Sequence, residues 1–169
     1  GVYINAGKEV GVASTKTFTN QIIVLSLISC YFSQIQEYRK MKRLKVLEDL
    51  HNLSNNIKST IQNCENICKE ISSYLHKTLE KQTLFILGKG SLKSIAHEGS
   101  LKFKELTYIN ADGCNANSLR HGPYAVLKQG TPVIFLHTNE QCLKSNMEEI
   151  YSRKADVLVI TSEKDINVA

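Results

Sequence analysis

Residues 84–111 have the sequence LFILGKGSLKSIAHEGSLKFKELTYINA, and this stretch decides the fold. Four apolar residues come first, a glycine-bearing turn follows at 88–91, and an apolar and polar pattern of helical period then continues to Ile109. A short apolar strand that leads through a turn into an amphipathic helix is typical of a βαβ unit. The stretch therefore predicts a strand at 83–87 and a helix at 91–109, in a protein of the α/β class.

The residues that follow continue the alternation of strands and helices. We expect, in order, an irregular loop with a short helix through Leu127, a strand at 133–137, a helix at about 140–153 and a strand at 157–161. Apolar strands that alternate with helices form parallel sheets, because a parallel pair needs a crossover connection, usually a helix. We therefore predict a three-layer αβα fold around a parallel sheet.

The first half of the chain predicts mostly helix. We expect, in order, a strand at 2–6, a glycine-bearing loop at 7–11, a helix at about 14–36 and a polar helical stretch at about 44–80. The polar stretch contains no Pro or Gly, and its expected breaks are Asn55 and Asn56. It is therefore predicted to be a helical connector and not a flexible linker.

Composition favours a cytoplasmic protein with a buried core. The chain has 169 residues, of which 42% are hydrophobic. Ser26 and Ser29 interrupt the apolar run at 22–32, so no apolar stretch reaches the roughly 18 residues of a membrane span. The cysteines lack the spacing of a disulfide framework, which favours reduced thiols. They are Cys30, Cys64, Cys68, Cys114 and Cys142.

Two other clusters lack the pattern of a binding site. Cys64 and Cys68 lie four residues apart, but a zinc site needs two more ligands at a suitable spacing. The net charge of +5 is concentrated partly in the basic run at 39–45. No aromatic residue interleaves with this run, and Glu48 and Asp49 follow it, so it predicts a solvated connection between helices. We expect no metal, no cofactor, and no nucleic-acid or membrane partner.

One stripe of the predicted 91–109 helix carries the candidate chemistry. At about 100° per residue, Glu98, Lys102 and Glu105 fall on one line within the apolar arc. Residues three and four apart on a helix touch, so the lysine can pair with both carboxylates. A carboxylate tuned by burial and a nearby cation suits general base catalysis, although ordinary surface ion pairs have the same spacing. Further along, His121 precedes a Gly-Pro turn and adds an imidazole.

Two loops precede helices and admit two interpretations each. The turn at 88–91 resembles a phosphate-binding loop in its position, but it matches neither the dinucleotide nor the P-loop pattern. A helix cap by Ser91 is the favoured interpretation. In the loop at 11–16, Ser14 and Thr15 are placed to cap the next helix.

Three blocks of sequence, taken in order, resemble one family. They are NAGKEVGVASTKTFTNQI at 5–22, LFILGKGS at 84–91, and EGSLKFKELTYINA at 98–111 with LRHGP at 119–123. The blocks resemble the isomerase half of the glucosamine-6-phosphate synthase family, which is built from two sugar isomerase (SIS) subdomains. The resemblance implies the end of a first SIS subdomain at 1–37, a helical connector at 38–80, and a second SIS subdomain, truncated at its C-terminal end, at 81–169.

The same resemblance implies an aldose–ketose isomerisation of a sugar phosphate. Ammonia from a glutaminase domain in the same parent chain converts fructose 6-phosphate into an imine, and proton transfer from C1 to C2 gives glucosamine 6-phosphate. Glu105 matches the carboxylate that carries the proton, and Lys102 matches a lysine that stabilises the enol-type intermediate. His121 matches the histidine that assists ring opening. Glu98 matches a supporting carboxylate.

For substrate binding, the resemblance places Val12 and Ser14 beside the sugar phosphate. It also implies a homodimer through the SIS domains, because the family's histidine serves the neighbouring subunit's site. Asn117 and Ser118 stand where the family usually has Gly and Glu. The family's phosphate loop and C-terminal tail fall outside this sequence, so we expect the chain alone to be inactive.

Two other functions stay open at this point. One is a non-catalytic phosphosugar-binding module that regulates a partner. The other is a different phosphosugar isomerase or deglycase. Retention of Lys102, Glu105 and His121 disfavours the regulatory module, because binding alone does not need a base.

Overall fold

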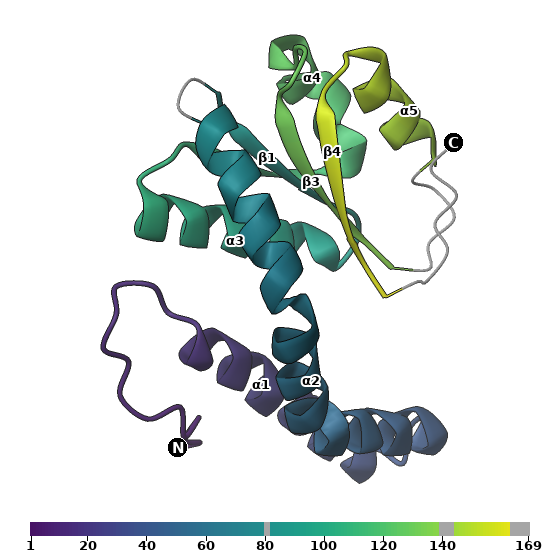
Figure 1. The fold of residues 1–169 in the computed structure, drawn as a ribbon. Coiled ribbons are helices and arrows are strands. Elements are labelled where there is room, and N and C mark those ends of the chain that lie inside the picture. The colour runs from purple at the N-terminus through teal and green to yellow at the C-terminus, as the bar shows by residue number, and fades with distance from the viewer. Residues whose placement is uncertain (80–81, 139–143, 163–169) are drawn as a thin grey trace. The chain divides into compact units, whose positions relative to one another are not determined.

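The computed structural model describes residues 1–79, 82–138 and 144–162 (Figure 1). The chain divides into two compact units, residues 1–70 and 71–169, and each is described by itself. The elements, in order, are α1 (Lys16–Ile35), α2 (Lys40–Thr78), β1 (Leu84–Gly88), α3 (Leu92–Thr107), β2 (Ala111–Asn115), the 3-10 helix η1 (Ala116–His121), α4 (Pro123–Val126), β3 (Pro132–His137), α5 (Lys144–Ser152) and β4 (Asp156–Thr161).

The second unit is built on a four-stranded sheet in the order β2-β1-β3-β4. All three strand pairs are parallel, as the alternating pattern predicts. Every residue of β1 is buried, which is typical of a central parallel strand covered on both faces. The predicted α/β class and parallel sheet are therefore confirmed.

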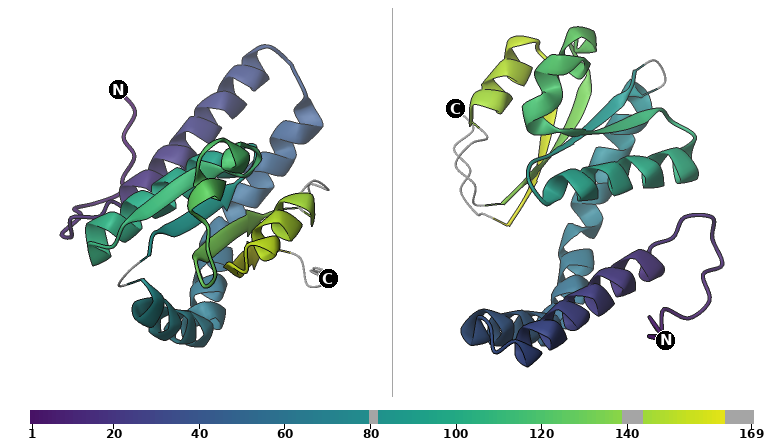
Figure 2. Two further views of the ribbon diagram at one scale, coloured as in Figure 1. Left: turned by 90° about the horizontal axis from the view of Figure 1, so that it is seen from above. Right: turned by 180° about the vertical axis from the view of Figure 1, so that it is seen from behind.

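Side chains of β1 alternate between two hydrophobic clusters, one on each face of the sheet. Phe85 and Leu87 pack with residues of η1 and α5, such as Leu119 and Ile150. Leu84 and Ile86 pack on the other face, with residues that include Leu75 from the last turn of α2, Leu79 directly after it, and Ala96 from α3. The period-two alternation of a strand thus builds the predicted three layers (Figure 2).

Two glycines let α3 approach the sheet closely. A Cβ atom on Gly88 would lie 2.1 Å from the carbonyl oxygen of Leu92, and one on Gly113 would lie 2.5 Å from that of Ala96. Both contacts are with backbone, which cannot swing away as a side chain does. The position of α3 on β1 and β2 therefore depends on the absence of side chains at these two positions.

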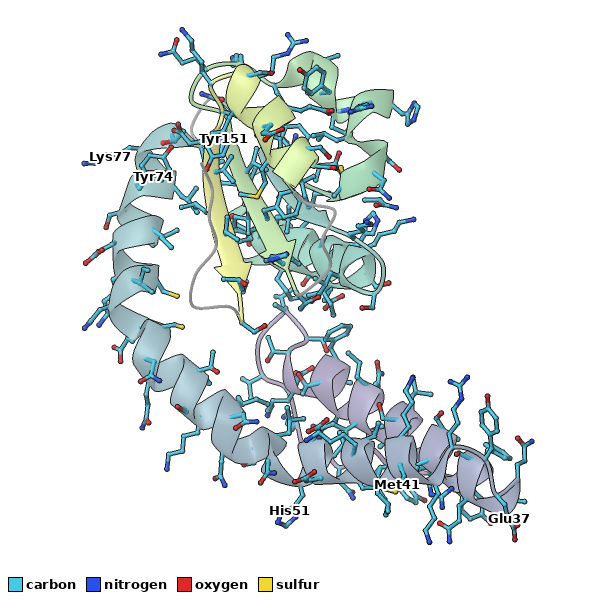
Figure 3. The ribbon with its side chains drawn as sticks, turned by 90° about the vertical axis from the view of Figure 1, so that its right-hand side faces the viewer. Glu37, Met41, His51, Tyr74, Lys77 and Tyr151 are labelled. Atoms are coloured by element: carbon cyan, nitrogen blue, oxygen red, sulfur yellow. The ribbon has the colours of Figure 1, made fainter. Side chains whose placement is uncertain are left out.

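A long-range hydrogen bond ties the end of α2 to the sheet. The Tyr74 hydroxyl donates to the Asp156 carboxylate at the start of β4, across 82 residues of sequence (Figure 3). Burial and this hydrogen bond raise the pKa of Tyr74, so the phenol stays protonated as the donor at neutral pH.

Several boundaries differ from the sequence-based predictions. Residues 2–6 form no strand. The predicted irregular loop begins with a strand, β2, which was missed because its sequence ADGCN is poor in strand-forming residues. Helix α2 continues through Asn55 and Asn56, since an asparagine costs a helix interior only about 0.7 kcal/mol. Residues 140–143 of the predicted 140–153 helix lie outside the described residues.

The first unit contains α1 and most of α2. Arg43 Nη1 donates to the carbonyl oxygen of Ser33 at 3.0 Å and stabilises the end of α1. The basic run at 39–45 lies mainly in the first turns of α2, which begins at Lys40. Cys30 is the one buried residue among residues 1–70.

The apolar run at 22–32 lies within the longer helix α1. The helix has 20 residues and an 18-residue window of mean hydropathy 1.3, so its length and composition are sufficient to cross a membrane. The prediction that no stretch reaches this length was wrong, because the mean hydropathy over 18 residues is high enough even with Ser26 and Ser29 in the helix. The Ser26 hydroxyl donates to the Ile22 carbonyl oxygen of the same helix. A core helix of a soluble protein meets the same test, so the finding assigns no membrane role.

The cysteines within the described residues are free thiols: Cys30, Cys64, Cys68 and Cys114. Cys142 lies outside the described residues. Burial raises the pKa of Cys114 to about 12, so this thiol is protonated and acts as a packing group. The described residues hold no group of three or more His, Cys, Asp or Glu placed to bind a metal ion.

Candidate active site on helix α3

Helix α3 brings Glu98, Lys102 and Glu105 together as the sequence predicts. Lys102 Nζ lies 2.8 Å from Glu105 Oε2 and 3.3 Å from Glu98 Oε1. The three side chains are between 18% and 27% exposed, whereas the side chains of the Lys69–Glu65 pair on α2 are 69% and 64% exposed. The row is therefore half-buried, which separates it from an ordinary surface ion pair.

The two carboxylates determine the charge state of Lys102. Its hydrogen bond to Glu105 raises the pKa of Lys102, burial lowers it, and the hydrogen bond to Glu98 raises it again, with a net upward shift. The lysine is thus cationic at neutral pH and acts as a fixed positive charge, not as a base. A fixed cation of this kind stabilises negative charge that develops on a reacting oxygen.

The apolar neighbours of the row are less buried than the helical pattern predicts. Ala96 and Ser100 face the sheet and are buried, but Leu106 is 62% exposed and Leu101 is 43% exposed. The charged row thus lies at the border between the packed and the open side of α3. On the face predicted to be solvated, His97, Lys104 and Tyr108 are exposed, as expected.

His121 ends η1, and Gly122 separates it from α4. Gly122 has φ 151, a value that favours glycine, and Pro123 starts α4. The His121 side chain is exposed. Within the described residues, the ion pairs and hydrogen bonds of Glu98, Lys102 and Glu105 stay on α3 and do not reach His121. The structure therefore shows Glu98, Lys102 and Glu105 in direct contact, and the role of His121 stays a prediction.

Val12 and Ser14 belong to the first unit, on the loop before α1. Val12 is 84% exposed and Ser14 is half-buried. They lie in the first unit, whereas Glu98, Lys102 and Glu105 lie in the second.

Glu9 organises that loop, a role that the sequence argument missed. One Glu9 oxygen accepts hydrogen bonds from the backbone N–H groups of Thr15, at 2.8 Å, and Thr17, at 3.2 Å. The other accepts from the Thr17 hydroxyl at 2.8 Å. The hydrogen bond from the Thr15 backbone, followed by those from Thr17 and Ser14, lowers the pKa of Glu9 to about 2. The carboxylate is therefore ionised at the positive end of α1.

The predicted side-chain caps were wrong at both helices. Thr15 stands at the N-cap of α1 and Ser91 at that of α3, but neither side chain makes a capping hydrogen bond. At α1, the Glu9 carboxylate takes this place from outside the helix. At α3, the N–H groups of Leu92 and Lys93 bond to the carbonyls of Lys89 and Gly90 in a tight turn.

Comparisons with known proteins agree with this fold. A family model described as the SIS domain matches residues 78–169. The glutamine–fructose-6-phosphate aminotransferase (isomerizing) of Encephalitozoon cuniculi is 34% identical over 167 residues, which cover 96% of this chain and 23% of that protein. The protein of the same name from Chlorobaculum tepidum is 36% identical over 168 residues, which cover 98% of this chain and 27% of that protein. The chain spans about a quarter of the length of these curated relatives.

A solved structure resembles nearly the whole chain. It is the C-terminal domain of glucosamine-fructose-6-phosphate aminotransferase from Francisella tularensis, with a TM-score of 0.85 and 29% sequence identity. The similarity covers 93% of this chain and 44% of that one.

Proposed function

Because the chain belongs to the SIS domain family, we propose that it forms part of the isomerase portion of an enzyme that makes glucosamine 6-phosphate from fructose 6-phosphate and glutamine-derived ammonia. The names of the relatives described above support this assignment. The observation that carries it is the half-buried row on α3, in which one lysine lies between two carboxylates.

The row supplies a base and a cation at one place. In the proposed reaction, Glu105 removes a proton from C1 of the fructose 6-phosphate imine and delivers it to C2. Lys102 binds Glu105 through Oε2, so Oε1 is the oxygen that we assign to proton transfer. Lys102 stabilises the negative charge of the enol-type intermediate, and Glu98 supports it as the second partner that holds the lysine in place.

Three further residues have proposed roles in the reaction. His121 assists the opening of the sugar ring, which needs an acid–base group near the hemiacetal. Val12 offers a backbone carbonyl to the sugar phosphate and Ser14 a hydroxyl. The loop that carries both is held against α1 by Glu9, which supports a fixed position for them within the first unit.

We extend the proposal to the context of the chain. It comprises the end of a first SIS subdomain at 1–37, a connector at 38–80 and a second SIS subdomain at 81–169. The enzyme carries a glutaminase domain, is a cytoplasmic homodimer, and belongs to amino sugar biosynthesis. Since the chain spans about a quarter of its relatives' length, we expect no turnover by the chain alone.

The test is Glu105→Gln in the enzyme that contains this chain. The substitution keeps the size of the side chain and removes the base, and a positioned acid–base group contributes about 100- to 10,000-fold in rate. We expect a loss of that order in glucosamine 6-phosphate formation, while glutamine hydrolysis continues. Glu65→Gln, which removes the exposed carboxylate partner of Lys69 on α2, is the control. Normal isomerisation by Glu105→Gln would reduce Glu105 to an ion-pair partner of Lys102.

A further inference from the structure

One face of α5 contacts the segment that carries His121 at three places. Asn146 Nδ2 donates to the Ala116 carbonyl oxygen at 2.6 Å, at the start of η1. Arg120 donates to both oxygens of Glu149, from Nε at 3.0 Å to Oε2 and from Nη2 to Oε1. The third contact joins the Ser152 and Tyr124 hydroxyls, whose oxygens lie 3.3 Å apart. The α5 residues that make the three contacts are spaced by three: Asn146, Glu149 and Ser152.

These contacts lie on both sides of His121. They fix the chain five residues before it, one residue before it and three residues after it. Leu119, buried at 1% exposure, anchors the same segment in the core. Figure 1 shows α4 and α5 side by side at the same end of the sheet. The imidazole is therefore exposed, but the backbone that presents it is held by a neighbouring helix.

The Arg120–Glu149 pair differs from a helical surface ion pair. It joins two elements that are 29 residues apart, and its planar guanidinium bonds the carboxylate through two nitrogens. Arg120 is 69% exposed, so the pair has little value for stability, but its two parallel bonds fix direction. The Arg120 hydrogen bond lowers the pKa of Glu149, which keeps this carboxylate ionised at neutral pH.

We propose that α5 positions His121 for its reaction, with Arg120 and Glu149 as the positioning pair. Neither residue is assigned contact with substrate. The proposal rests on the proposed function, since it takes His121 as the group that opens the sugar ring. An imidazole whose backbone is fixed on both sides stays near its productive position without paying the entropy of ordering a free loop.

The experiment uses the enzyme that contains this chain and compares Glu149→Gln with Glu65→Gln as the control. Turnover is measured on cyclic fructose 6-phosphate and on an open-chain analogue that bypasses ring opening. Amide hydrogen exchange is measured at 117–122. We expect Glu149→Gln to slow turnover of the cyclic substrate about 10- to 100-fold, as for a displaced catalytic group, with a smaller effect on the analogue. Exchange at 117–122 is expected to become faster, and glutamine hydrolysis is expected to persist.

Two further variants separate the possible outcomes. The charge exchange Arg120→Glu with Glu149→Arg restores the pair and is expected to recover part of the lost rate. The proposal would be overturned if Glu149→Gln left amide hydrogen exchange at 117–122 unchanged and also left unchanged the ratio of turnover on the cyclic substrate to turnover on the open-chain analogue. Equal slowing of both substrates with no recovery by the charge exchange would also overturn it. If exchange at 117–122 rises but His121→Asn leaves the substrate ratio unchanged, α5 still positions the segment, and it is the proposed role of His121 in ring opening that fails.

Discussion

Gly113→Ala tests whether the close packing of α3 sets the position of its charged row. The added Cβ would lie 2.5 Å from the Ala96 carbonyl oxygen and 2.6 Å from the His97 Cα atom, whereas ordinary contacts begin at 3.4 Å. The difference is about 0.9 Å, and both neighbours are backbone atoms, so α3 has to move away from β2 by about this distance. Overpacking of this kind costs about 1–3 kcal/mol of stability.

The same displacement moves Glu105 relative to any substrate held elsewhere in the site. A misplacement of about 1 Å costs about 100-fold in rate. We therefore expect Gly113→Ala to lower isomerisation about 100-fold in the enzyme that contains this chain, to lower the melting temperature of the SIS portion by several degrees, and to spare glutamine hydrolysis. The assay measures glucosamine 6-phosphate formation beside glutamate formation.

Gly99→Ala is the matched control, because it adds the same methyl group on α3 itself. Its Cβ would lie 3.4 Å from Ile86 Cδ1, which is an ordinary contact with the end of a side chain. Alanine also favours the helix by up to about 1 kcal/mol over glycine. We expect unchanged or higher stability and near-normal isomerisation. If Gly113→Ala behaves like Gly99→Ala, the packing of α3 on β2 does not control the site.

Three other outcomes follow from the structure. The pKa of Glu9 is about 2 in the folded protein and ordinarily 4.5. The contribution of this carboxylate to stability is therefore complete above about pH 4.5 and is lost as the pH falls towards 2. Glu9→Gln is expected to remove this pH dependence, measured by amide hydrogen exchange at 15–19. His121→Asn is expected to slow turnover of cyclic fructose 6-phosphate more than that of an open-chain analogue, with little change in melting temperature, and equal slowing with a lower melting temperature would withdraw the catalytic assignment. Phe135→Ala is expected to cost about 3–5 kcal/mol in chemical denaturation, because this fully buried ring lies in the core between the sheet and α5.

The local sequence pattern was sufficient to predict elements that are buried evenly on both faces or along one side. Strand β1 is a continuous apolar run because it is covered on both faces, and α3 has a helical period because one side of it meets the sheet. The ion pairs of Lys102 were predicted for the same reason, since three- and four-residue spacing on a helix fixes which side chains touch.

The parts that sequence did not predict depend on partners outside the helix or strand to which the residue belongs. Strand β2 contains Asp112, Gly113 and Asn115, which are depleted in strands, and its glycine is needed by α3 and not by the strand itself. Glu9 caps α1 from outside the helix, although Thr15 satisfies the local rule for a cap. The Arg120–Glu149 pair joins residues 29 positions apart, and no local spacing announces it.

In the second unit, different residues pair the charges of the α3 row and set the position of α3 on the sheet. Lys102 pairs with both Glu98 and Glu105 within one helix and compensates one of the two negative charges; the carboxylate side chains are 24% and 27% exposed, so water reaches the remaining charge. The sheet contributes position instead, through the close approach that Gly88 and Gly113 permit. The partner of the carboxylates and the position of α3 thus depend on different residues. Substitutions at Gly113 and at Glu105 are therefore expected to reduce isomerisation for separable reasons. Loss of the base leaves α3 in place, whereas loss of the close approach leaves the base intact and moves it.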